Sequence, residues 1–230
     1  MRKDSTMAHF FSKFKKLGIV LLFLSVIIIY FIYTLLTPEE TLPVYQPDMV
    51  NAELVDTTMQ YVRKYHKIAD FKLVNQNGDT ITQDFYKDKI YVADFFFTTC
   101  QTICPIMTDH MLEIQEKIKD DPEVFLLSHT VIPKADSVPA LKKYALDKGV
   151  IDKKWNLVTG DKKQIYDLAR KSYLATKTDG NGGPYDMIHT ENFVLVDRNS
   201  QIRGFYDGTD PDAIQDLMED INLLKSKNKK

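Results

Sequence analysis

One segment limits what this chain can fold into more than any other: the run LGIVLLFLSVIIIYFIYTLL at residues 17–36, which contains no charged residue. As an α-helix, a run of this length spans about 30 Å, the thickness of a bilayer core. The run is longer than the apolar region of a typical signal peptide, and no small-x-small cleavage site follows it. We therefore expect a single uncleaved transmembrane helix at residues 17–36.

The charges on either side of this run set its expected orientation. Residues 1–16 carry five basic side chains and one acidic one, whereas Glu39 and Glu40 follow the run. By the positive-inside rule, residues 1–16 lie in the cytoplasm and the remainder of the chain lies outside. No Arg- and Ser-rich transit peptide precedes the run, which favours a bacterial inner membrane with the C-terminal part in the periplasm.

The chain after the membrane run divides into a linker, one domain and a tail. Residues 37–51 contain three prolines and are typical of an extended linker. Residues 52–226 have a suitable length for a single domain, and residues 227–230 form a basic tail. The whole chain has 30 basic and 32 acidic side chains, and its formal net charge of −2 gives no reason to expect nucleic-acid binding.

Strand and helix patterns alternate along the domain. Residues 71–82 read as a β-hairpin with its turn at Asn77-Gly78, and IYVADFFF (90–97) reads as a central strand buried on both faces. The same patterns predict strands at 52–56, 123–132, 155–159, 192–197 and 201–206, and helices at 103–119, 136–148, 161–173 and 210–225. This order predicts an α/β thioredoxin-like fold, with a mixed central sheet flanked by helices and an N-terminal β-hairpin.

Both cysteines of the chain follow the predicted central strand, in the sequence TTCQTICP. Cys100 stands at the N-terminus of the next helix, where the helix dipole lowers the pKa of a thiol. Cys104 lies about one helical turn further, so both sulfur atoms point the same way. The spacing permits a disulfide or a single ion between the sulfurs. In the periplasm, a close pair of this kind indicates a functional rather than a structural role.

A third metal ligand must come from the five histidines. His9 precedes the membrane run, His66 stands among basic residues and is expected on the solvated surface, and His110 lies almost two turns beyond Cys104. His189 precedes the strand at 192–197, in the loop that faces the cysteine motif of a thioredoxin-like fold. Two thiolates and one imidazole form a soft, low-coordinate set that suits copper in either oxidation state, whereas structural zinc needs four ligands.

The stretches DFFFTTCQTICPIMT and DMIHTENFVLVD, together with the N-terminal anchor, resemble the Sco/SenC family of membrane-tethered copper proteins in cytochrome c oxidase assembly. The family pattern is C-x-x-x-C-P with a distant histidine before a strand, which Cys100, Cys104, Pro105 and His189 match. The resemblance covers about residues 60–225. It implies that Cys100, Cys104 and His189 bind copper, and that the two cysteines also act as a redox pair that forms a disulfide when oxidised.

The resemblance implies a metallochaperone that delivers copper to the binuclear copper site of the oxidase's copper-bearing subunit. Another periplasmic copper carrier and a thiol reductant are further candidate partners. One alternative is a membrane-anchored thiol–disulfide oxidoreductase that keeps a partner's cysteines reduced. Another is a redox or copper sensor. Whether the chain is an enzyme stays open, and the metallochaperone role is the favoured interpretation.

One departure from the family pattern concerns His129. After the strand at 123–130, the family usually has an Asp-Pro pair in a stretch SVDP, whereas the present chain reads SHTVIPKADSVP. His129 either tunes the site, serves as an accessory ligand, or is simply packed or solvated at the strand end. We favour the last of these, because ligating imidazoles are the minority. Met107 and Met111 lie on an apolar helical stripe and are expected in the core. A peroxiredoxin-type peroxidase is disfavoured, because its Pro and Thr positions hold Ala93 and Phe97.

Overall fold

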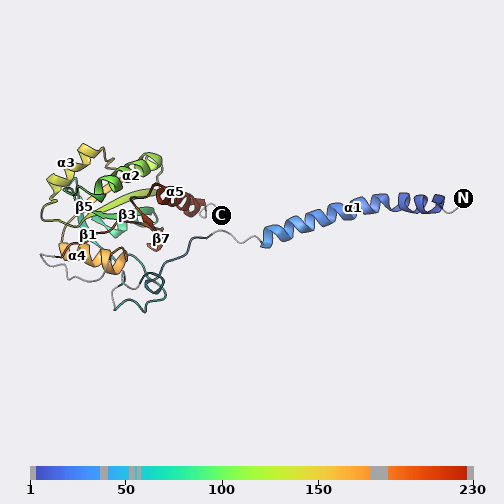
Figure 1. Ribbon diagram of the computed structural model, residues 1–230, viewed down its shortest axis with the longest axis horizontal. Coiled ribbons are helices and arrows are strands. Elements are labelled where there is room, and N and C mark those ends of the chain that lie inside the picture. Colours follow the sequence, from blue (N-terminus) through green and yellow to red (C-terminus); the bar gives the residue numbers. More distant parts are fainter. Residues whose placement is uncertain (1–3, 37–40, 52–54, 56–57, 177–185, 227–230) are drawn as a thin grey trace. The chain divides into compact units, whose positions relative to one another are not determined.

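The computed structural model describes residues 4–36, 41–51, 55, 58–176 and 186–226 of the chain (Figure 1). It divides the chain into two compact units, Met1–Thr41 and Leu42–Lys230. The strand expected at 52–56 falls outside the described residues except for Val55, and the expected basic tail at 227–230 also falls outside them.

The first unit is a single helix, α1 (Asp4–Leu36), which is about 50 Å long at the usual rise per residue. Its segment Leu17–Leu36 has a mean hydropathy of 2.9, and none of that window is buried. The helix is therefore long and apolar enough to cross a membrane, as the sequence predicts from length and composition. It begins further toward the N-terminus than the predicted span.

The second unit is built around a seven-stranded sheet with the strand order β2-β1-β5-β4-β3-β6-β7. Strands β3 (Ile90–Phe96), β4 (Val124–Thr130) and β5 (Trp155–Thr159) are parallel to one another and form its centre. On one side, the antiparallel hairpin of β1 (Lys72–Asn75) and β2 (Thr80–Thr82) joins β5. On the other, β6 (Asn192–Val196) and β7 (Ile202–Asp207) join β3 antiparallel.

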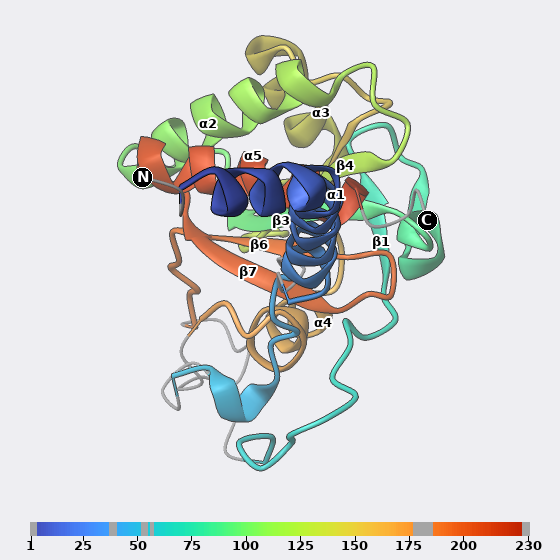
Figure 2. The same cartoon turned by 90° about the vertical axis from the view of Figure 1, so that its right-hand side faces the viewer.

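Helices cover both faces of this sheet (Figures 1 and 2). One face carries α2 (Ile103–Ile118), α3 (Val138–Lys148) and α5 (Pro211–Ser226). The other carries α4 (Lys162–Asp167), which continues as a π-helical turn over Leu168–Ser172. Two short 3₁₀ turns, Pro47–Met49 and Gln83–Tyr86, lie in the connections. The mixed sheet between two helical layers confirms the predicted fold class.

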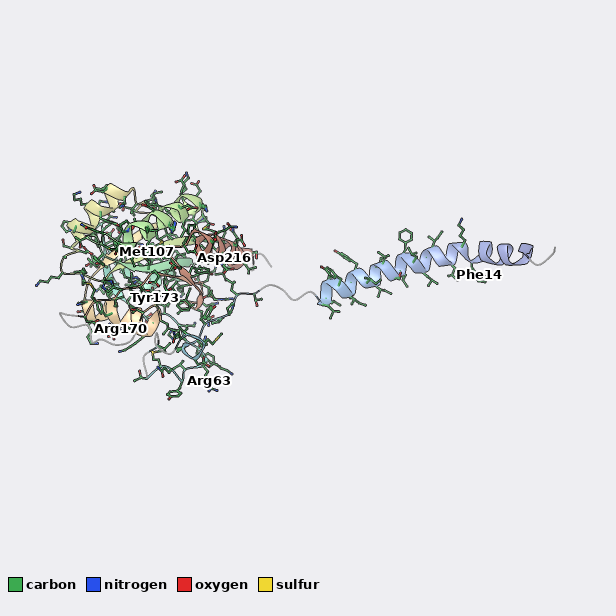
Figure 3. The ribbon with its side chains drawn as sticks, in the orientation of Figure 1. Phe14, Arg63, Met107, Arg170, Tyr173 and Asp216 are labelled. Carbon is green, nitrogen blue, oxygen red and sulfur yellow. The ribbon has the colours of Figure 1, made fainter. Side chains whose placement is uncertain are left out.

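The central strand divides its side chains between two apolar clusters, and all seven of its residues are buried. Ile90 and Val92 pack beneath α2, α3 and α5, in the cluster that also contains Met107 and Met111. Tyr91 and Phe95 face the opposite cluster, which contains Tyr173. Figure 3 labels one member of each cluster, Met107 and Tyr173. The near-continuous apolar run at 90–97 thus has the cause that the sequence suggested, since a strand covered on both faces needs no polar side.

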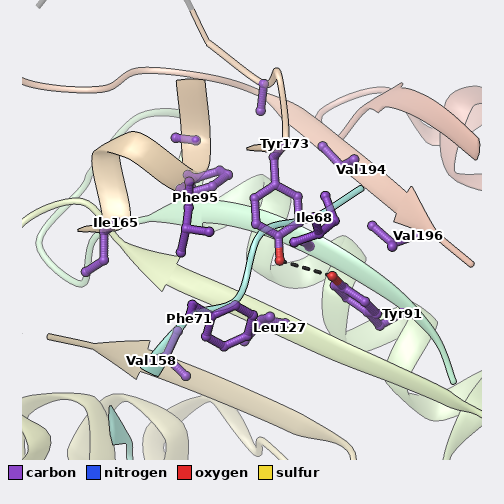
Figure 4. Close-up of a cluster of buried hydrophobic side chains, with 14 of the residues drawn as sticks. Ile68, Phe71, Tyr91, Phe95, Leu127, Val158, Ile165, Tyr173, Val194 and Val196 are labelled. Atoms are coloured by element: carbon purple, nitrogen blue, oxygen red, sulfur yellow. Dashed lines mark hydrogen bonds between the residues drawn. The ribbon is translucent and has the colours of Figure 1, made fainter. Parts of the chain in front are cut away.

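The second cluster is rich in aromatic side chains, and its two central hydroxyl groups lie together. The Tyr91 and Tyr173 hydroxyls are 3.2 Å apart inside the shell of apolar side chains drawn in Figure 4. Each buried hydroxyl thereby gains a hydrogen-bond partner, which reduces the cost of removing it from water. This cluster supports the face of the sheet from which the segment carrying His189 departs.

Candidate metal centre

The two cysteines flank the start of α2, after the turn in which β3 ends. The N–H of Cys100 donates to the carbonyl of Phe97 at 3.2 Å, which closes the turn. Thr102 occupies the N-cap position of α2, but its side chain makes no capping bond there. Because the first N–H groups of a helix have no partner within the helix, they are available to a thiolate. Cys104 lies in the first turn and is only 4% exposed, whereas Cys100 is half-buried.

A buried carboxylate holds this turn in place. Thr98 donates to Asp136 through both its hydroxyl, at 2.5 Å, and its backbone N–H, at 3.2 Å. The hydroxyl of Thr130, at the end of β4, donates to the same carboxylate, which is 1% exposed. Ser137 takes the N-cap position of α3, while Asp136, one residue earlier, ties the cysteine turn to the neighbouring strand. Sequence reasoning missed this role because the partners are far apart along the chain.

The two thiols have opposite acidities. Burial alone would raise the pKa of the Cys100 thiol, but the hydrogen bond from the Cys104 thiol and those from Thr102 and the backbone of Cys104 outweigh it. They lower the Cys100 pKa to about 7. Burial and the hydrogen bond donated to Cys100 raise the Cys104 pKa to about 12. At pH 7 about half of the Cys100 thiols are therefore ionised, whereas Cys104 stays protonated, so the thiolate forms on the more exposed sulfur.

His189 lies near this pair but is not grouped with it. Its ring meets the ring of Phe97 edge-on, with 6.4 Å between the centroids, and its side chain is exposed. Within the described residues, no three His, Cys, Asp or Glu side chains stand close enough to hold an ion. The structure thus brings Cys100 and Cys104 together, and it places His189 against the ring of Phe97.

The segment that carries His189, residues 186–190, is fixed at both ends. Asp186 receives two hydrogen bonds of 2.7 Å from Arg170, and the two side chains are 8% and 7% exposed. At the other end, the Thr190 hydroxyl donates to the carbonyl of Ala175 at 2.7 Å. Ile188 is buried between these anchors. We call residues 186–190 the His189 strap.

His129 packs in the core rather than lining the thiols. Its ring stacks on Phe95 with centroids 4.9 Å apart and also contacts Phe71 and Tyr173. Burial lowers its pKa to about 4, so the imidazole is neutral. Its Nδ1 lies 3.3 Å from the carbonyl of Asp94, and its Nε2 has no hydrogen-bond partner within the described residues. Of the two favoured positions, packed or solvated, the structure has the packed one.

Asp94 is a buried acid beneath the cysteines that the sequence reading did not single out. Burial raises the pKa of its carboxyl to about 7, although a hydrogen bond from Ser128 acts in the opposite direction. Within the described residues its Oδ1 has no partner. Its charge also contributes to the raised pKa of Cys104. A single acidic residue inside an otherwise apolar strand was the available sequence signal.

The surface position expected for His66 is wrong. His66 is 5% exposed, and its Nε2 lies 2.7 Å from the carbonyl of Ser172. Its basic neighbours Lys64 and Lys67 are exposed, whereas the imidazole between them is buried. His110 is half-buried, with its Nδ1 2.7 Å from the carbonyl of Gly208. Neither histidine contributes to the cysteine pair.

This fold and site have counterparts among known proteins. Residues 59–224, well over half of the chain, match the profile of the SCO1/SenC family. The chain belongs to the SCO1/SenC family. The matched region contains both cysteines, the buried Asp94 and Asp136, and the His189 strap, so the Sco domain includes every element of the candidate site.

Individual Sco relatives agree with this assignment. The chain is 31% identical over 158 residues to the SCO1 protein homolog of Bacillus subtilis, an alignment that covers 68% of this chain and 81% of the relative. It is similar to the solved structure of BsSco, described as a member of the Sco family of cytochrome c oxidase assembly proteins with a disulfide switch. That structure has a TM-score of 0.59 and 30% identity, over 70% of this chain and 94% of BsSco. The copper-bound structure of Bradyrhizobium japonicum ScoI has a TM-score of 0.51 and 25% identity, over 67% of this chain and 99% of that one. These similarities confirm the thioredoxin-like fold predicted from the sequence.

Proposed function

We propose that this Sco chain is a membrane-anchored copper carrier that binds copper through Cys100, Cys104 and His189. The observation that carries the proposal is the cysteine pair at the start of α2, which holds a thiolate near neutral pH on a partly exposed sulfur. Thiolate and imidazole ligands suit copper, and a bound copper ion favours deprotonation of a coordinating thiol. The copper-bound ScoI relative supports the same cargo.

The separation of His189 from the thiols gives the site an order of events. Cys100 offers the first thiolate, and Cys104 loses its proton as copper binds, since metal ligands must be deprotonated. The ring contact with Phe97 keeps His189 next to the cysteine turn, and the imidazole would have to move toward the sulfurs to reach the ion. The copper is cargo here, held in a site that opens to solvent at Cys100.

The placement of the carrier in the cell follows from the helix and its flanking charges. We propose that residues 17–36 span a bacterial inner membrane, with residues 1–16 in the cytoplasm and the domain 52–226 in the periplasm behind the linker 37–51. In that compartment the acceptor would be the copper-bearing subunit of cytochrome c oxidase, because BsSco belongs to a family of assembly proteins for that oxidase. Another copper carrier would supply the copper, or a thiol reductant would supply reducing equivalents to the cysteine pair.

Copper stoichiometry of the purified full-length chain in detergent tests the ligand set. We expect one copper per chain for the natural sequence, loss of binding for Cys100→Ser and Cys104→Ser, and weakened binding for His189→Ala. His110→Ala serves as the matched control, since its ring is held by Gly208 and should leave binding unchanged. Copper binding that survives Cys100→Ser, or that ignores His189→Ala, would refute the assignment.

A second candidate function uses the same pair as a thiol–disulfide oxidoreductase that keeps partner cysteines reduced. The unequal acidities of Cys100 and Cys104 favour it, because an exposed thiolate attacks while a buried thiol resolves the mixed disulfide. Trapping a partner on Cys104→Ser would support this role. Oxidase activity in a deletion strain separates the candidates: rescue by added copper favours the carrier, rescue by added reductant favours the reductase, and unchanged activity favours a sensor.

A further inference from the structure

Met187 shares one face of the His189 strap with His189. No helix or strand includes residues 186–190, and burial alternates along them: Ile188 and Thr190 are 3% and 6% exposed, whereas Met187 is 47% exposed and His189 is also exposed. Alternation of this kind is typical of an extended backbone, in which side chains two residues apart point to the same side. Met187 and His189 therefore leave the strap in the same direction, away from the core.

The anchors of the strap fix this direction. The Arg170 guanidinium grips the Asp186 carboxylate immediately before Met187, and the Lys162 ammonium donates to the Asp186 carbonyl at 2.8 Å. At the other end of the strap, the Thr190 hydroxyl donates a hydrogen bond to the carbonyl of Ala175. Because both ends are held and Ile188 is buried between them, rotation of the strap to bury Met187 would break these contacts. The exposure of Met187 is built into the fold.

The shared face borders the cysteine turn. The His189 ring packs against Phe97, whose carbonyl accepts the N–H of Cys100. Phe97 and Cys100 both pack against the cluster that contains Cys104. The backbone positions of Met187 and His189 are about 6.5 Å apart in an extended chain, so two such side chains can converge on one ion. A thioether is a neutral, soft donor that suits Cu(I) and not the harder cations.

We propose that Met187 is a further copper donor of this chain, which binds Cu(I) beside His189 on the outer face of the strap. This inference rests on the proposed copper-carrier function. The strap then supplies a soft pair, thioether and imidazole, beside the turn formed by Phe97 and Cys100. Cuprous copper gains a donor that cupric copper does not favour, so Met187 selects the oxidation state of the cargo.

Methyl NMR of the full-length chain in detergent tests this directly, with methionines labelled at the ε-methyl carbon and one equivalent of Cu(I) added without oxygen. We expect the Met187 signal, assigned with Met187→Leu, to shift on Cu(I) addition. The Met49 signal serves as the control, because Met49 is 53% exposed but lies on the 3₁₀ turn Pro47–Met49. A Met187 signal that does not move with Cu(I) would overturn the proposal.

Two further measurements make the outcome specific. Competition with a Cu(I) chelator should show Cu(I) affinity at least about tenfold weaker in Met187→Leu, the lower end of what losing a supporting metal contact costs. Met49→Leu should have the natural affinity, and Cu(II) affinity should be the same in all three proteins. A titration of free thiols during Cu(I) addition separates the two proposals. Thiols consumed while the Met187 signal stays unmoved refute only the Met187 donor, whereas thiols that stay free refute the cysteine copper site and, with it, the function on which the Met187 proposal rests.

Discussion

The lowered pKa of Cys100 leads to a prediction about how the rate of its reaction with a disulfide depends on pH. The hydrogen bond from the Cys104 thiol is the largest of the contacts that lower the Cys100 pKa to about 7. Cys104→Ala removes this donor with little change in volume. We expect the Cys100 pKa to rise toward about 8.5, the value of a free cysteine, and to stop short of it because the contacts from Thr102 remain.

The size of the effect follows from two opposing terms. At pH 7 a thiol of pKa 7 is about half ionised, whereas one of pKa 8.5 is about 3% ionised, which is a loss of roughly 16-fold in thiolate. The more basic thiolate is intrinsically about fourfold more reactive toward a disulfide, since reactivity rises with pKa. If the Cys100 pKa rises fully to 8.5, Cys104→Ala should therefore react about fourfold more slowly than the natural chain at pH 7 and about fourfold faster at pH 10. The two profiles should cross near pH 8.

The assay is the first phase of the reaction with an aromatic disulfide reagent, followed by absorbance from pH 5.5 to 10. The natural chain should release two reporter thiolates per chain as its own disulfide forms, and Cys104→Ala should release one. Cys100→Ala is the control: it leaves only Cys104, whose burial raises its pKa, so it should react slowly throughout. Profiles that run parallel without crossing, or a midpoint near 8.5 in the natural chain, would refute the thiol–thiolate hydrogen bond.

Two further predictions concern stability, with the fluorescence of Trp155 in denaturant as the probe. Arg170→Met leaves Asp186 buried without its ion-pair partner and should lower the free energy of unfolding by about 3–5 kcal/mol. The double variant Arg170→Met with Asp186→Leu should recover most of this loss. A loss under about 1 kcal/mol in Arg170→Met would contradict a strap held by this pair. Burial raises the folded-state pKa of Asp94 to about 7, so the folded chain keeps a proton that the unfolded chain releases near pH 4. The free energy of unfolding therefore declines as pH rises from about 4, and the contribution of this proton is lost as pH rises through 7. Asp94→Asn should remove this decline of up to about 1.4 kcal/mol per pH unit, and a stability difference between the two proteins that stays constant from pH 4 to 8 would contradict it.

The fold was predictable because its signals are local. The charge-free run at 17–36, the β-branched and aromatic strand at 90–97 and the Asn77-Gly78 turn each determine their own element. Gly149 ends α3 with a φ of +81°, and Asp161 caps α4 by accepting from the N–H of Gln164, which are local roles typical of these residue types. The cysteine pair was equally accessible, since three intervening residues at a helix start fix the relative positions of both sulfurs.

The surroundings of the pair were not predictable, because they depend on contacts between residues distant in sequence. Asp136 is a residue type that often caps helices, but it accepts a hydrogen bond from Thr98, 38 residues away. His66 has basic neighbours, yet it binds the carbonyl of Ser172 across 106 residues. A motif identifies which side chains act, whereas the packing of separate segments determines how close they come. His189 illustrates the limit, since it reaches the edge of Phe97 but not the sulfurs.

The contrast between the two thiols gives a physical reason for a carrier rather than a permanent copper site. Because the pKa of Cys104 is raised to about 12, this thiol is protonated at pH 7, so a copper ion in the proposed site would have to displace its proton. Competition from that proton would lower the copper affinity of the site. In the proposed carrier, reprotonation of Cys104 would offset part of the cost of releasing the ion to an acceptor. A site built to keep copper would instead lower both pKa values; unequal acidities suit a protein that must also let copper go.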